Sequence, residues 1–127
     1  MGDYSATLLN GQSIYIPSWP VQVQLENLTK AGKALGISEV VSMSENSIPS
    51  FIRAIMNCED SNLAASLVKH FVCTVRMDGK KLTPDTIDDI FEGNLSLMAE
   101  IFCHVMHSQY HSFFVSGLAE AVSPPSL

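Results

Sequence analysis

The chain has 127 residues, of which 46% are hydrophobic and 16% charged, and its net charge is −6. This length and apolar content predict a single domain over residues 1–127 that buries a core without disulfides or metal. The negative charge argues against nucleic acid as a partner, and no apolar run approaches the roughly 20 residues that span a bilayer, so we expect neither nucleic-acid nor membrane binding.

The acidic charge is unevenly distributed. Residues 1–81 contain all seven basic residues and seven acids, so this part of the chain is neutral. Residues 82–127 contain six acids and no Lys or Arg. The acidic C-terminal third is therefore either a solvated face or a docking surface for a neutral or basic protein.

The first expected element is a β-hairpin over residues 5–16. Strand-like sequences lie on both sides of Asn10-Gly11, a pair that accepts the positive φ values of a tight turn. The period of two places Ile14 and Ile16 on the same face.

A helical bundle is expected over residues 20–117. Its first helix should run from about residue 21 to Gly36, with the apolar stripe Val21, Leu25, Leu28 and Leu35. Residues 37–49 are expected to form a loop. Two further helices should follow, one capped by Ser50 and one that is capped by Asp60 or Ser61 and reaches about Met77. The inward side chains of the former would be Phe51, Ile52, Ile55 and Met56.

The next segment has the clearest turn and cap signals. Asp78-Gly79 predicts a turn, and Thr83 would cap a short helix with Pro84 at its first position. Phe91 would face inward and Gly93 would end this helix. We expect all of these residues to act structurally: Asp78, Gly79, Thr83, Pro84, Phe91 and Gly93.

The last helix should begin at Asn94 or Ser96 and run to about Gly117, followed by a flexible end over residues 118–127. The predicted fold is thus mainly α with a small N-terminal β-hairpin, an α+β arrangement with a compact bundle of about five helices.

Glu100, His104, His107 and His111 share a stripe roughly 60° wide on the last helix, opposite most of its apolar residues. We expect this stripe to face solvent or a partner; a pH-sensitive surface and a metal site are alternatives. His107 and His111 have the spacing of a helical zinc pair, but the sequence lacks the Glu of H-E-x-x-H and a convincing further ligand. We therefore predict no metal and no cofactor.

The burial of the aromatic residues at the end of this helix is predicted from their angular positions around the helix axis. Phe113 continues the side of Phe102 and should lie in the core, whereas Phe114, beside Tyr110, should be exposed. The helix is either fully buried or keeps a second apolar face for a partner. The candidate partner-binding residues are Tyr110, Phe114, His111 and His107.

Catalytic signals are missing from the sequence. It contains no G-x-S-x-G, P-loop or paired-carboxylate pattern. Its three cysteines are odd in number and form no CxxC motif, as expected for reduced thiols in a cytoplasm. We expect the protein not to be an enzyme.

Three short motifs between Val75 and Phe114 form a recognisable pattern. They are a D-G-x-x-L turn at Asp78, an F-x-G helix end at Phe91, and a last helix that ends near the aromatic pair at Phe113. In these motifs, and in overall layout over residues 5–116, the chain resembles the small tail assembly chaperones of tailed bacteriophages.

This resemblance implies a non-enzymatic helper that binds the tape-measure protein until tail-tube subunits polymerise around it. It implies action in the host cell cytoplasm and absence from the mature virion. The tail-tube protein is a second implied partner, and a homo-oligomer is left open. The alternative is a structural tail or baseplate component that is retained in the virion.

Overall fold

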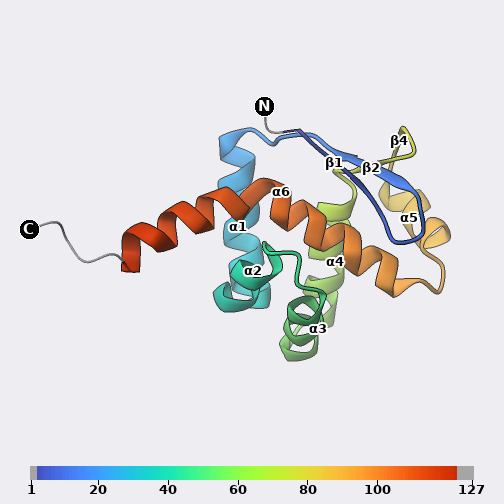
Figure 1. Ribbon diagram of the computed structural model, residues 1–127. Coiled ribbons are helices and arrows are strands. Elements are labelled where there is room, and N and C mark those ends of the chain that lie inside the picture. Colours follow the sequence, from blue (N-terminus) through green and yellow to red (C-terminus); the bar gives the residue numbers. More distant parts are fainter. Residues whose placement is uncertain (1–2, 123–127) are drawn as a thin grey trace, which may run out of the picture.

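The computed structural model describes residues 3–122, with side-chain burial described as far as Ser116. These residues form a four-stranded sheet and six α-helices, which confirms a mainly α fold with a small β part (Figure 1). The elements in chain order are β1 (Tyr4–Thr7), β2 (Ser13–Ile16), α1 (Val21–Leu35), α2 (Ile37–Met43), α3 (Ile48–Asn57), α4 (Ser61–Val72), β3 (Arg76–Met77), β4 (Lys80–Lys81), α5 (Pro84–Ile90) and α6 (Leu95–Val122).

The sheet is antiparallel throughout, in the order β1-β2-β3-β4. The expected N-terminal hairpin is present, with Ile14 and Ile16 both buried on its inner face. The prediction that the helix capped by Asp60 or Ser61 reaches Met77 is wrong, because this helix, α4, ends at Val72 and Met77 pairs with Ile14 of β2. This pairing joins residues far apart in the sequence, so no local pattern could reveal it.

The loop expected over residues 37–49 is largely helical. Gly36 has φ of 86°, a conformation that glycine adopts without the steric cost of a side chain, and it lets α2 follow α1 at once.

The buried face of α1 differs from the predicted apolar stripe. Asn27, Ala31 and Leu35 are buried, whereas Val21 and Leu25 are exposed.

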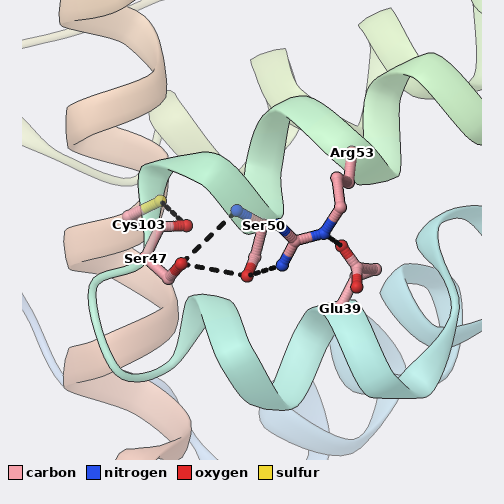
Figure 2. Close-up of polar contacts among 5 residues, drawn as sticks. All are labelled: Glu39, Ser47, Ser50, Arg53 and Cys103. Atoms are coloured by element: carbon pink, nitrogen blue, oxygen red, sulfur yellow. Dashed lines mark hydrogen bonds and ion pairs between the residues drawn. The ribbon is translucent and has the colours of Figure 1, made fainter.

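The start of α3 is held by a polar network that ties α2, α3 and α6 together (Figure 2). Ser47, not Ser50, is the cap, and its hydroxyl accepts from the N–H of Ser50 at 3.4 Å. Arg53 Nη2 donates to the buried Ser50 hydroxyl at 3.0 Å, and Arg53 Nε donates to Glu39 at 3.2 Å. The Cys103 thiol donates to the carbonyl of Ser47 at 3.7 Å. The helix therefore starts about one turn earlier than expected. Two of its side chains that were expected to face inward, Ile52 and Met56, are exposed.

Asp78 joins the two hairpins of the sheet. Its φ is 51°, and its carboxylate accepts from the N–H of Ser13 at 3.1 Å and from the amide of Gln12 at 3.2 Å. Gly79 follows with φ of 82°. The turn predicted at these residues is therefore present, and it also anchors the first hairpin.

The predicted start of α5 matches the structure. Thr83 precedes the helix and its N–H donates to the Thr86 hydroxyl at 3.4 Å, while Pro84 is the first helical residue. The helix ends at Ile90; the buried Phe91 follows as its C-cap, and Gly93 has φ of 68° just beyond it.

The last helix crosses the other helices, and its C-terminal turns extend beyond them (Figure 1). Asn94 caps α6, accepting from the N–H of Leu97 at 3.1 Å. The helix continues to Val122, past the expected end at Gly117; the rest of the predicted flexible end, residues 123–127, lies outside the described residues.

An aromatic chain forms the centre of the core. The ring centroids of Phe51 and Phe102, and of Phe102 and Phe71, lie 5.3 Å apart in each pair, and Trp19 packs edge-on against Phe71 at 5.4 Å. These contacts connect the start of α1 with α3, α4 and α6. They place α6 at the centre of the fold. The elements packed around α6 therefore determine which of its faces are exposed.

Candidate functional site

The Glu/His stripe of α6 lies beneath the N-terminal hairpin, so the expectation that it faces solvent is wrong. Glu100 Oε2 accepts from the N–H of Leu9 at 3.0 Å, and Nδ1 of His104 is hydrogen-bonded to the hydroxyl of Tyr4 at 3.0 Å. His104 Nε2 lies 4.0 Å from Glu100 Oε2, and both side chains are mostly buried. The stripe is opposite the apolar face as predicted, but the hairpin covers it.

The C-terminal half of the stripe packs against the end of α2. His107 Nδ1 donates to the carbonyl of Ser44 at 2.8 Å, and the His107 ring stacks on His111 with centroids 4.6 Å apart. Burial lowers the pKa of His104, and this effect outweighs the opposing charge of Glu100. The His104 ring is therefore neutral near pH 7, which suits an interior contact.

The arrangement of these side chains offers no metal centre. Within residues 3–122, no group of three or more His, Cys, Asp or Glu side chains is placed to hold a metal ion. His104 and His107 each use Nδ1 in a hydrogen bond inside the protein.

Burial raises the pKa of the Cys103 thiol to about 12, so this cysteine is protonated at neutral pH and is a poor nucleophile.

The aromatic pair at the end of α6 has the reverse of its predicted burial. Phe113, expected in the core, is 58% exposed, and Phe114, expected at the surface, is 8% exposed. Tyr110 is also buried; its hydroxyl donates to the carbonyl of Gln24 at 2.8 Å, and burial raises its pKa. The buried row therefore continues from Met106 through Tyr110 to Phe114, and Phe113 is left outside it.

Phe113 belongs to an apolar groove between α1 and α6. The groove has a volume of about 120 Å³, and we call it the α1/α6 groove. It is lined by Val21, Gln24, Leu25, Leu28, Gln109, Tyr110 and Phe113. Val21 is 71% exposed and Leu25 is 61% exposed, and none of the lining residues is charged. Three large apolar side chains from two helices thus gather at one accessible site.

The sequence contained part of the signal for this groove. Val21 and Leu25 belong to the apolar stripe expected on the first helix, and Phe113 is an apolar position of the last helix that was expected in the core. These residues do lie on helices. The sequence of α1 alone does not show that Asn27 and Ala31, and not Val21 and Leu25, face the core. An exposed apolar cluster of this kind marks an interaction site more often than an isolated exposed side chain does.

Comparison with known families assigns the chain. A family model described as "Phage tail assembly chaperone protein, TAC" matches residues 10–120. The chain belongs to the phage tail assembly chaperone family. No curated protein and no solved structure gives a significant match to it.

The family match bears directly on the candidate site. The matched residues include every residue of the α1/α6 groove, so the groove is part of the family domain and not of an appended segment. None of the helices within the described part of the chaperone combines the length and hydropathy needed to cross a membrane. A tail assembly chaperone acts through protein partners during assembly, and an accessible apolar groove is the kind of surface that such contacts use.

Proposed function

We propose that this chaperone binds the tape-measure protein through the α1/α6 groove while the tail is assembled. The observation that carries the proposal is the exposure of Phe113 beside Val21 and Leu25. A large aromatic side chain at the surface is a typical anchor of a protein interface, because its burial contributes much binding free energy at a small cost in side-chain entropy. The tail-tube protein is the second candidate partner.

The chemistry of the groove suits a client that must later be released. Burial of apolar surface contributes about 25 cal/mol per Å² and requires no exact match of charges, so the groove can accept apolar residues from varied segments. Its small size limits the affinity of any single contact. The acidic C-terminal third of the chain keeps the chaperone in solution while this apolar surface is accessible.

The proposal is tested by co-expressing the tagged chaperone with a fragment of the tape-measure protein. Phe113→Ser should reduce the captured fragment by roughly tenfold, as expected for loss of a buried aromatic anchor. Val115→Ser is the matched control, because Val115 is another exposed apolar residue of α6 but does not line the groove. If both variants capture the client as well as the parent protein does, the groove is not the client surface.

The place and time of action need a separate experiment. We propose that the chaperone acts in the host cytoplasm and leaves before the virion is complete. Mass spectrometry of purified particles should then detect tail-tube and tape-measure peptides without this chain. Its presence in mature particles in a fixed ratio to a tail protein would instead identify it as a retained structural component.

A further inference from the structure

The two edges of the four-stranded sheet differ in how they are protected. At one edge, β4 is only two residues long and consists of the exposed Lys80 and Lys81. Short edge strands and lysine side chains are common features that keep one sheet from pairing with another. At the other edge, β1 is four residues long and contains neither a charged residue nor a proline. The β1 edge therefore lacks the protection that the β4 edge has.

The hydrogen bonds of β2 show which backbone groups of β1 point outward. Ser13 is the partner of Thr7, yet Ser13 donates its N–H to the Asp78 carboxylate at 3.1 Å and accepts from the Asp78 N–H at 2.9 Å. The backbone groups of Ser13 thus face β3, so Thr7 and Ser13 form a pair without mutual hydrogen bonds. The adjacent pair is bonded, because the N–H of Leu8 donates to the carbonyl of Gln12 at 2.8 Å.

Ser5 and Thr7 carry the free backbone groups of this edge. Bonded and non-bonded pairs alternate along an antiparallel ladder, so the pair of Ser5 and Tyr15 is also non-bonded. The N–H and carbonyl groups of Ser5 and Thr7 therefore point away from β2, and no strand of the described chain lies beyond β1. Both residues are exposed, and within residues 3–122 their backbone groups take part in no turn, loop or cap hydrogen bond. Such an edge can accept another strand.

We propose that two copies of the chain associate by pairing their β1 strands antiparallel, about a two-fold axis at Ala6. In this register Ser5 of each copy lies opposite Thr7 of the other, and each of these two pairs exchanges both of its backbone hydrogen bonds. The pairing uses every free backbone group of β1, whereas an axis at Ser5 would place Thr7 beyond the end of the opposing strand. The two sheets become one continuous sheet, with the helices of both copies on the same side.

The side chains and charges at this edge suit a second copy as the occupant. The residues that meet are Ser5 and Thr7, and cross-strand pairs of hydroxyl side chains are favourable. The nearest acidic residue is Asp3, which lies three residues from the axis. The two copies of Asp3 are therefore roughly 20 Å apart along the strands, well beyond the Debye length of about 8 Å at physiological salt. This interface is separate from the α1/α6 groove and independent of the client-binding function proposed above.

The association is measured on the isolated chain, with no client present. An interface of this size belongs to the weak class, so sedimentation equilibrium should show the mean mass rising from one chain toward two between about 10 μM and 1 mM. Amide hydrogen exchange gives a residue-specific readout. Exchange of the Ser5 and Thr7 amides should slow as the concentration rises, whereas exchange of Ala6, whose N–H already bonds to β2, should stay unchanged.

Two double variants that differ in the sign of one charge test the interface. Ser5→Lys combined with Thr7→Lys places like charges opposite each other in both pairs and should weaken association roughly tenfold. Ser5→Lys combined with Thr7→Glu places opposite charges in both pairs and should associate at least as tightly as the parent protein. Both positions are exposed, so both variants should retain the fold, and circular dichroism checks this.

The same variants also test the register. An axis at Ser5 or at Thr7 would bring like charges together in both double variants, so weaker association of both would overturn the axis at Ala6. A parent protein that remains monomeric up to about 1 mM would overturn the proposed interface. Association that persists unchanged in the variant with two lysines would also overturn it, since the copies would then meet through another surface.

Discussion

The hydroxyl of Tyr4 and Nδ1 of His104 form a hydrogen bond of 3.0 Å that joins β1 to the middle of α6. The same hairpin reaches α6 a second time through the N–H of Leu9 and the carboxylate of Glu100. Polar residues on α6 thus fasten the hairpin to the helix. A stripe that would suit a solvent-facing helix or a metal pair serves instead as the inner surface of the fold.

This contact predicts a specific loss of stability in acid. Burial lowers the pKa of His104 below its ordinary value, so from about pH 6.5 downward the unfolded chain binds a proton that the folded protein does not. The free energy of unfolding should therefore fall as the pH decreases through this range. Thermal melts at pH 7.5 and 5.5 should show a smaller decrease in Tm for His104→Gln than for the parent protein, because Gln does not titrate.

The aromatic pair of α6 predicts opposite effects for two adjacent substitutions. Phe114→Ala removes a buried ring and should cost about 3–5 kcal/mol of unfolding free energy, as large core truncations do. Phe113→Ala removes an exposed ring and should change stability by no more than about 1 kcal/mol. Urea denaturation of both variants measures the difference. Equal losses would show that both rings are packed in solution.

The elements predicted correctly from sequence are those whose signals are local. Thr83 and Pro84 start α5 as expected, and Asp60 caps α4, because caps and turns depend on residues within one turn of each other. Ile14 and Ile16 share one face of the hairpin as expected from the strand period, and that face is buried.

Two of the errors arise from contacts between distant segments. Met77 was expected in a helix and lies in a strand. Its strand partner Ile14 belongs to another hairpin, so this pairing leaves no signal in the residues around Met77. The predicted burial of Phe113 and Phe114 is the reverse of the observed burial. The position of a residue around one helix does not show which neighbouring helix covers it.

Replacing either of two glycines should destabilise the protein, whereas replacing a nearby proline should have little effect on stability. Gly79 and Gly93 have φ of 82° and 68°, and a β-branched residue in that region is strained even where space is open. Gly79→Val and Gly93→Val should each cost about 1–2 kcal/mol or more. Pro84→Ala should stay within about 1 kcal/mol, because the first helical N–H needs no partner. Thermal melts of the three variants check this order.

Zinc should not stabilise the protein. His104 and His107 use Nδ1 in contacts with Tyr4 and the Ser44 carbonyl, so binding zinc through these atoms would break bonds that hold the fold. A metal that binds only the folded state raises Tm, so an unchanged Tm at modest zinc excess is the expected result. A rise of several degrees that His107→Ala abolishes would show that a site forms in solution.

The last prediction concerns how salt affects client capture. No charged residue lines the α1/α6 groove, so the contact around Phe113 should depend on apolar burial and not on screened charge. Raising sodium chloride from about 0.15 M to about 1 M shortens the Debye length from roughly 8 Å to 3 Å, yet the yield of co-purified tape-measure fragment should be retained. Leu25→Ser should lower that yield at both salt concentrations by a similar factor, since Leu25 lines the same groove. If capture disappears at high salt while Leu25→Ser has no effect at low salt, the acidic C-terminal third, and not the groove, holds the client.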